Sequence, residues 1–225
     1  MRTFAKARAL VAGLVVAAAA VPAAAQNFEF GTLLSGSFTP SGSFAHLSVR
    51  QVGPNVFDFS LHAGNLNALF TQGSFVGAVA VNVDPSVKAS AVTISNFSGY
   101  GVEAVTAKNG GGPGGVWEFR FAVGGGGASQ EGAYRLSSGE FASWTASFSS
   151  ALPVTFGGGG QPAFAAHVQG LTPAQGGSAW YAPSMTTAAP EPEVYAMMLA
   201  GLLLVGFAAR RRQSRLHPPE LMLRS

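Results

Sequence analysis

The 225-residue sequence contains no cysteine. Disulfides, thiolate zinc sites, iron–sulfur clusters and cysteine nucleophiles are therefore excluded, and the fold must be held together by core packing. Charge is also scarce, because only 10% of the residues are Asp, Glu, Lys or Arg, against about 25% in a typical soluble protein. The sequence shows no strand–helix alternation, so it gives no support to an α/β sheet.

The formal net charge of +3 is carried by the two ends of the chain. Between residues 26 and 189 there are five basic and seven acidic residues, a net charge of −2. Binding to nucleic acid requires a basic surface on the folded domain itself. The calculated pI of 9.6 therefore does not predict a nucleic-acid partner.

The N-terminus has the three parts of a secretory signal peptide. Three basic residues precede an apolar run over residues 9–21, and Pro22 follows. Ala23 and Ala25 then form an A-x-A cleavage site, which predicts that residues 1–25 are removed and that the mature chain starts at Gln26. The alternative is an uncleaved N-terminal anchor, against which Pro22 and the small residues argue.

A second apolar run without charge covers residues 194–209 and is followed by three arginines. As a helix these 16 residues would be about 24 Å long, which is short for a bilayer core of roughly 30 Å. The arginines can snorkel to the headgroups and should stay cytoplasmic. Pro190 and Pro192 cannot lie inside a regular helix, so they predict an extended, accessible segment on the outer side.

These parts resemble a known signal, the PEP-CTERM sorting signal of Gram-negative bacteria. The resemblance is carried by Pro190-Glu191-Pro192, the apolar run and Arg210-Arg211-Arg212. It implies that residues 190–212 are a sorting signal, that exosortase is the processing partner, and that the inner membrane is a transient one. Such proteins are usually linked to extracellular polysaccharide and biofilm. Family members usually end soon after the arginines, whereas here residues 213–225 form a further tail. The alternative is a tail anchor that is never cut.

The middle of the chain has the period-two alternation of half-buried strands, and glycine-rich turns separate the segments. We therefore expect an all-β fold, an antiparallel sandwich or barrel-like domain over residues 26–181, with a small-residue linker over 182–189. One short helix is expected within residues 65–72, and the glycine runs are expected to be mobile loops. The expected core faces are Phe57, Phe59 and Leu61; Phe75, Gly77, Val79, Val81 and Val83; Trp117, Phe119, Phe121 and Val123; Ala142, Trp144, Ala146 and Phe148; and Phe164, Ala166 and Val168.

One hairpin can be placed in register. If Gly53-Pro54-Asn55 is a three-residue loop, the two strands pair with apolar side chains on one face and polar side chains on the other. A two-residue Pro54-Asn55 turn suits proline better but shifts this pairing, so the face pattern favours the longer loop. The predicted opposite pairs are Val52–Val56, Gln51–Phe57, Arg50–Asp58, Val49–Phe59, Ser48–Ser60, Leu47–Leu61 and His46–His62.

Candidate chemistry is sparse. His46 and His62 across the hairpin are the nearest approach to a metal site, but such a site needs a third ligand, and two solvent-facing polar residues are the simpler interpretation. Arg50 and Asp58 are expected to form a cross-strand ion pair rather than a catalytic dyad. No nucleophile elbow or phosphate-binding loop is present. We therefore predict neither an enzyme nor a cofactor.

The resulting hypothesis is an exported, non-catalytic protein of the cell surface or extracellular matrix. It would be held in the inner membrane before sorting, with a structural or adhesive role linked to exopolysaccharide and biofilm. The alternative is a carbohydrate- or ice-binding β-module retained as a single-pass membrane-anchored protein. One segment suggests it, the row Ser143, Thr145, Ser147 and Ser149 on one side of residues 143–150. The adjacent aromatics Trp180-Tyr181 could stack on sugar rings, but core packing or strand capping is their simpler interpretation.

Overall fold

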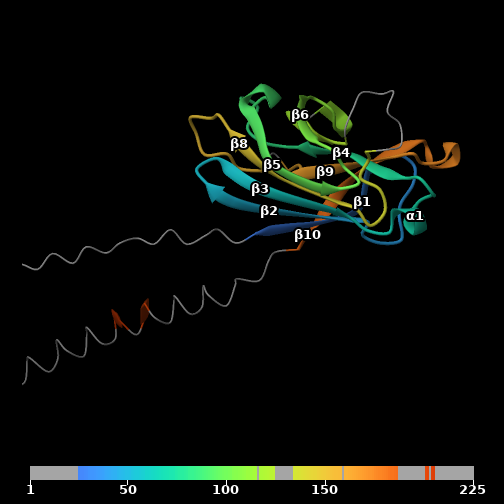
Figure 1. The fold of residues 1–225 in the computed structure, drawn as a ribbon, viewed down its shortest axis with the longest axis horizontal. Helices are drawn as coiled ribbons and strands as arrows, with labels where there is room; N and C mark the ends of the chain where they lie inside the picture. Colours follow the sequence, from blue (N-terminus) through green and yellow to red (C-terminus); the bar gives the residue numbers. More distant parts are fainter. Residues whose placement is uncertain are drawn as a thin grey trace, which may run out of the picture.

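A computed structural model describes residues 25–115, 117–124, 134–158, 160–186, 201–202 and 204–205. Within this part of the chain ten strands form one sheet, in which each neighbouring pair is antiparallel (Figure 1). The strand order is β5-β8-β3-β2-β1-β10-β9-β4-β7-β6. The strands are β1 (Gln26–Ser35), β2 (Ala45–Gly53), β3 (Val56–Ala63), β4 (Phe75–Val81), β5 (Val92–Tyr100), β6 (Val105–Asn109), β7 (Phe119–Val123), β8 (Phe141–Phe148), β9 (Phe164–Gln169) and β10 (Ser178–Thr186).

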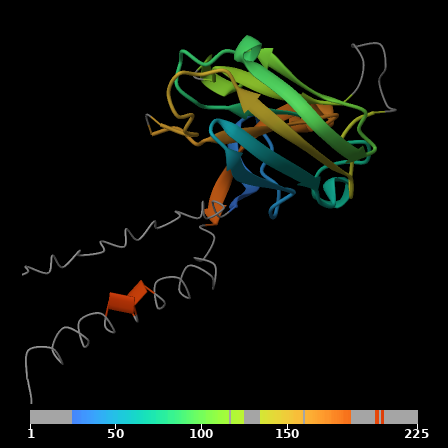
Figure 2. The same ribbon diagram turned by 60° about the vertical axis from the view of Figure 1, so that its left-hand side comes forward.

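The sheet curls until its two edge strands, β5 and β6, approach each other. Figures 1 and 2 show the strands wrapped around a common interior. The all-β prediction of an antiparallel sandwich or barrel-like domain is therefore confirmed, as a nearly closed structure. Closure removes most of the exposed sheet edge, which suits a chain without disulfides.

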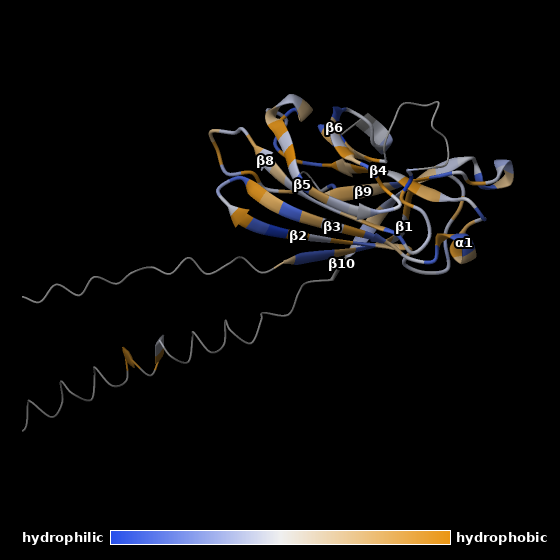
Figure 3. Ribbon diagram, viewed as in Figure 1, coloured by the Kyte–Doolittle hydropathy of each residue, from blue (hydrophilic) through white to orange (hydrophobic). Residues whose placement is uncertain are grey.

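The core lies between the two halves of the curled sheet and is rich in aromatic rings. Phe59 on β3 stacks on Trp144 of β8 at 5.3 Å between ring centroids, and contacts Phe121 of β7 edge-on at 5.1 Å. Phe28 on β1 meets Phe164 on β9 at 4.9 Å. The alternation that predicted these strands is visible along β3 in Figure 3. The predicted core faces of β3, β8 and β9 are confirmed, since their members are all buried.

The hairpin register is confirmed from His46–His62 to Gln51–Phe57. At the turn the prediction is wrong in one detail: Val56 lies opposite Gly53 rather than Val52. A β-bulge between Gln51 and Gly53 adds one residue, so the two-residue Pro54-Asn55 turn and the predicted faces exist together.

A second bulge changes the predicted face of β4. Its register shifts between Val76 and Ala78, so Val76 joins the core with Val79 and Val81. Gly77 instead lies on the outer face, beneath the Gln169 side chain. The prediction that Phe75 and Gly77 share the face of Val79 is therefore wrong, because strict period-two alternation does not survive an inserted residue.

Trp117 was predicted on the core face of β7, and this is also wrong. The residue precedes β7, packs in a separate buried cluster with Ala80 and Ala165, and donates from Nε1 to the carbonyl of Pro113 at 2.9 Å. The 3₁₀ turn η2 (Pro113–Gly115) supplies that carbonyl. The loop therefore supplies the acceptor that this indole N–H needs when it is buried.

β10 runs to Thr186, so residues 182–186 are strand and not part of the predicted linker. Pro183 fits inside a central strand because it lies next to a register shift in β1, between Phe30 and Thr32. Its other neighbour, β9, pairs with β10 only over residues 178–181. The missing N–H of Pro183 therefore breaks no ladder on that side.

Two local predictions concern loops. The short helix is confirmed as α1 (Leu66–Leu69), capped by the Asn65 side chain. Two further 3₁₀ turns are η1 (Ala89–Ala91) and η3 (Pro173–Gln175). The glycine run that starts at Gly157 is an ordered turn where it is described, since Asn82 donates to the carbonyls of Gly158 and Pro162 at 3.3 Å. Positive φ angles at Gly157, Gly158 and Gly160 explain the glycines.

The predicted C-terminal transmembrane helix falls almost entirely outside the described residues, as does most of the signal peptide. Residues 201–202 and 204–205 are helical. Within the described part of the chain, no helix has the length and apolar character needed to span a membrane.

Candidate functional site

The sorting residues predicted from the sequence lie outside the described residues. These are Ala23 of the signal cleavage site, Pro190, Glu191 and Pro192, and Arg210, Arg211 and Arg212. On the exported side of the predicted signal cleavage site, Gln26 is the first residue of β1 and pairs with Val49 of β2.

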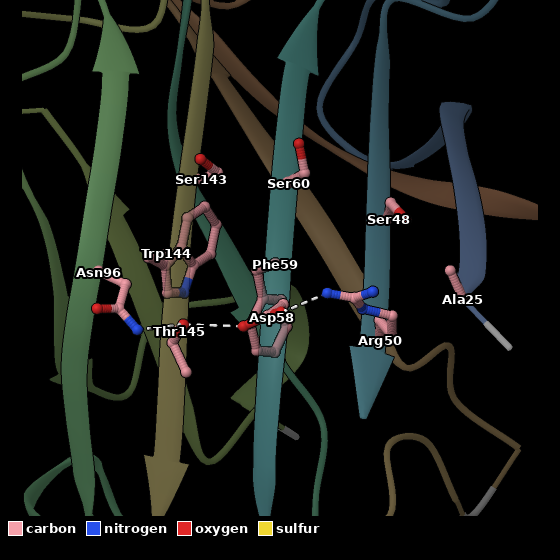
Figure 4. Close-up of a pocket in the computed structure, with 10 residues that line it drawn as sticks. All are labelled: Ala25, Ser48, Arg50, Asp58, Phe59, Ser60, Asn96, Ser143, Trp144 and Thr145. Atoms are coloured by element: carbon pink, nitrogen blue, oxygen red, sulfur yellow. Dashed lines mark hydrogen bonds and ion pairs between the residues drawn. The ribbon is translucent and has the colours of Figure 1, made fainter. Parts of the chain in front are cut away.

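Polar side chains of β5, β8, β3 and β2 lie together on the outer face of these strands, which we call the polar face (Figure 4). Asn96 donates from Nδ2 to the Thr145 hydroxyl at 3.2 Å, and that hydroxyl donates to Asp58 Oδ1 at 2.8 Å. Arg50 donates to Asp58 Oδ2 at 2.9 Å. The predicted Arg50–Asp58 ion pair is thus confirmed as one link in a chain of bonds across four strands.

The geometry of this polar face favours a structural role for it. Both oxygens of Asp58 accept a hydrogen bond, one from Arg50 and one from Thr145. The side chains of the ion pair are 55% and 36% exposed, so the pair contributes at most about 1 kcal/mol. The role of this chain of bonds is instead to hold β5, β8, β3 and β2 in register, because the hydrogen bonds link side chains on all four strands.

Sequence reasoning missed Asn96, which belongs to this face. It lies in a bulge of the edge strand β5, between Ser95 and Ser98, with a φ of 50°. The left-handed conformation suits asparagine, and it turns the side chain over Thr145 (Figure 4). The only signal available in the sequence was an asparagine in the middle of a strand pattern, which is weak.

His46 and His62 lie directly opposite each other, as predicted. Glu29 of β1 approaches His46 at 4.0 Å between Oε1 and Nε2, and accepts a hydrogen bond from Ser43 at 2.7 Å. His62 is stacked on Phe141 at 5.4 Å. In the described ranges, no group of three or more His, Cys, Asp or Glu side chains has the geometry to hold a metal ion.

The Ser/Thr row of residues 143–149 lies on the outer face of β8 only in part. Ser143 and Ser147 are half-buried, and Ser149 lies beyond the strand and is exposed. Thr145 is buried, and its hydroxyl is occupied by Asn96 and Asp58. The row therefore does not present a regular array of free hydroxyl groups.

Trp180 and Tyr181 point to opposite faces of β10. Tyr181 is fully buried, and its hydroxyl donates to the Phe38 carbonyl at 2.8 Å. Burial raises the pKa of Tyr181 to about 12. Trp180 lies on the outer face, half-buried, and stacks on His167 of β9. Of the two interpretations of this dipeptide, core packing holds for Tyr181, whereas Trp180 keeps an accessible aromatic surface.

Comparison with known proteins bears on the C-terminal segment. A family model described as the PEP-CTERM protein-sorting motif matches residues 188–212. No curated protein matches the chain. A solved structure described as "pH-induced modulation of Streptococcus parasanguinis adhesion by Fap1 fimbriae" aligns over 68% of this chain and 71% of its own, at 11% identity and a TM-score of 0.30. A likeness this distant carries no argument about fold or function.

Proposed function

Because this chain carries a PEP-CTERM protein-sorting motif at residues 188–212, with exosortase as the processing partner that the motif implies, we propose the following function. The chain is exported across the inner membrane, is anchored there by its C-terminal segment, and is cleaved by exosortase at Pro190-Glu191-Pro192. The β-domain then acts at the cell surface or in the extracellular matrix, in a non-catalytic structural or adhesive role linked to exopolysaccharide and biofilm. The motif match is the observation on which the proposal rests.

The fold supports this processing at both ends. β1 begins at Gln26 and β10 ends at Thr186, and these two strands pair so that Asn27 lies opposite Thr186. Gln26 and Thr186, the described strand residues nearest in sequence to the two proposed cuts, therefore lie at the same end of one strand pair. Both cuts would leave every described strand of the sheet in the released domain.

The test is the mature C-terminus of the protein from its native host, measured by intact mass and peptide mass spectrometry. Wild-type protein should end near Pro190, whereas Pro190→Ala with Pro192→Ala should accumulate as an uncut membrane form. Pro218→Ala with Pro219→Ala in the tail is the matched control and should be processed normally. A mature wild-type chain that still carries residues 210–212 contradicts the proposal.

A second candidate function is a carbohydrate-binding module retained as a single-pass membrane-anchored protein. It is favoured by one observation, the outward Trp180 stacked on His167. The two proposals differ in the fate of the C-terminus, so the same mass measurement separates them: retention of the C-terminal segment supports the anchored module. An ice-binding face needs a row of exposed hydroxyl groups. Thr145 is buried and its hydroxyl is hydrogen-bonded, so the Ser/Thr row gives no support to ice binding.

A further inference from the structure

A groove crosses the outer face of β6, β7, β4, β9 and β10, on the opposite half of the sheet from the polar face. Its volume is about 530 Å³, within the range of about 300–1,000 Å³ that is common for ligand sites. Trp180 and His167 are direct partners across β10 and β9, and their rings stack at 4.2 Å with an angle of 5°. They form a flat aromatic wall.

Small residues keep the floor of this groove open. Gly77, Ala78 and Ala122 line it between the aromatic wall and β6. The bulge in β4 turns Gly77 outward, and a Cβ there would collide with the Gln169 amide. The Gln169 side chain therefore lies against the backbone of β4 at Gly77, and it lines the groove.

The other wall of the groove carries two cations. Lys108 on β6 and Arg120 on β7 are direct cross-strand partners, and both line the groove. Like charges placed opposite each other destabilise a sheet, and none of the residues that line the groove is acidic. Arg120 Nη1 donates to the Gly110 carbonyl at 2.8 Å, which holds the guanidinium beside the groove.

The titration of His167 is consistent with a cationic groove. Burial, together with the nearby Arg120 charge, lowers the pKa of His167 to about 4. The imidazole is therefore neutral at neutral pH, and its contribution to the groove is a flat surface and a hydrogen-bonding edge. The fixed charge of the groove comes from Lys108 and Arg120.

We propose that this groove binds an acidic glycan, with a pyranose ring against the Trp180–His167 stack and its carboxylate between Lys108 and Arg120. A sugar ring offers an apolar face to the indole and hydroxyl groups to Gln169, while its carboxylate relieves the repulsion between the two cations. The net charge of −2 between residues 26 and 189 disfavours a nucleic acid, which needs an extended basic surface. The inference rests on the proposed function, because export is what brings the domain to extracellular polysaccharide.

The experiment measures binding of the purified protein, as processed by its host, to polygalacturonate by affinity electrophoresis and calorimetry. Neutral dextran and single-stranded DNA serve as comparison probes. Wild-type protein should bind polygalacturonate and not dextran, and the affinity should fall as salt is raised. Trp180→Ala and Lys108→Ala should each weaken binding by about tenfold. Tyr100→Ala and Lys88→Ala are matched controls at other exposed sites and should bind as wild type does.

Four outcomes overturn the inference: no binding to polygalacturonate, binding that Lys108→Ala leaves unchanged, equal affinity for dextran, or tighter binding to DNA. Lys108 is exposed, so its variant should fold even if Trp180→Ala does not. The C-terminus of each preparation is measured in parallel. A wild-type protein that is cut near Pro190 yet ignores polygalacturonate overturns the groove alone, whereas one that binds but is not cut overturns the sorting proposal alone.

Discussion

Replacing Asn55 should destabilise the domain by several kcal/mol, although the residue lies in a turn and is only half-buried. Asn55 has a φ of 54° in the turn between β2 and β3. Its side chain also fixes the segment after β8: Nδ2 donates to the carbonyls of Ser150 and Leu152 at 3.1 and 3.0 Å, and Oδ1 accepts from the Val154 amide at 2.8 Å. One residue therefore sets both a turn and a distant loop.

The magnitude follows from these contacts. A typical hydrogen bond contributes about 0.5–1.5 kcal/mol net, so the three bonds together contribute about 3 kcal/mol. Left-handed backbone costs most L-residues about 1–2 kcal/mol, but glycine visits it freely. Asn55→Gly should therefore lower the free energy of unfolding by about 3 kcal/mol. Asn55→Ala should lower it by about 1 kcal/mol more.

Urea unfolding followed by tryptophan fluorescence measures these losses. With an m-value of about 2 kcal/mol/M, the midpoint should fall by more than about 1 M in both variants. Pro54→Ala is the neighbouring control, and its effect should stay within about 1 kcal/mol. Losses below about 0.5 kcal/mol for both Asn55 variants would refute the assigned role, and equal losses for Ala and Gly would refute the backbone argument.

Three further predictions concern the outer faces and the core. The pKa of His167 is 6.5 in the unfolded chain and about 4 in the folded one, so between these pH values the unfolded chain binds the extra proton. The free energy of unfolding should therefore decrease as the pH is lowered through this window, by about 2 kcal/mol given partial exposure. Urea unfolding at pH 7 and at pH 4.5 should show a smaller decrease for His167→Gln than for the wild type. Tyr181→Phe should cost about 1–2 kcal/mol in urea unfolding, because it leaves a loop carbonyl without its donor, whereas Tyr100→Phe, at a side chain that is 68% exposed, should change nothing measurable. Asp58→Ala should lower the free energy of unfolding in urea by about 1 kcal/mol, and a double-mutant cycle with Arg50→Ala should give a coupling energy below about 1 kcal/mol. A larger coupling energy would show that this pair is more than a surface contact.

The sequence predicted much of the fold because most strands bury one face only. In the β2–β3 hairpin a one-residue slip would set apolar against polar side chains at every position, so the face pattern determined the register correctly up to Gln51–Phe57. The turn itself was not determined, because a bulge can add one residue without disturbing the faces. The residue types of Val52 and Gly53 do not by themselves predict that bulge.

The errors elsewhere have the same cause. Gly77 and Trp117 were placed on the core face by period-two alternation, and a bulge and a strand start moved both to the outer side. A glycine and a tryptophan in a strand pattern carry little information about where such an irregularity falls. In β10, the small residues from Ala182 onward predicted a linker, yet the strand continues to Thr186, and the register shift in β1 accommodates Pro183 within the sheet.

The candidate sites were less predictable than the fold, since they depend on which strands become neighbours. The pair Arg50–Asp58 lies within one hairpin and could be predicted, whereas Asn96 reaches Thr145 only because β5 pairs with β8. The groove lined by Lys108 and Trp180 depends on strands far apart in the chain. Long-range pairing of this kind leaves no local pattern in the sequence.

The placement of β1 and β10 in the sheet bears on how an anchored form would carry load. They are central strands, and β10 is hydrogen-bonded to β1 on one side and β9 on the other. A pull on the proposed C-terminal anchor would act along β10 and load both ladders in shear, so many hydrogen bonds would have to break together. An edge strand such as β5, pulled along its axis, would have one ladder to break, with β8, instead of two. Trp180 lies on β10 itself, whereas Lys108 and Arg120 lie on β6 and β7. A glycan held in the groove would therefore load the sheet through those strands as well as through the strand that leads to the anchor.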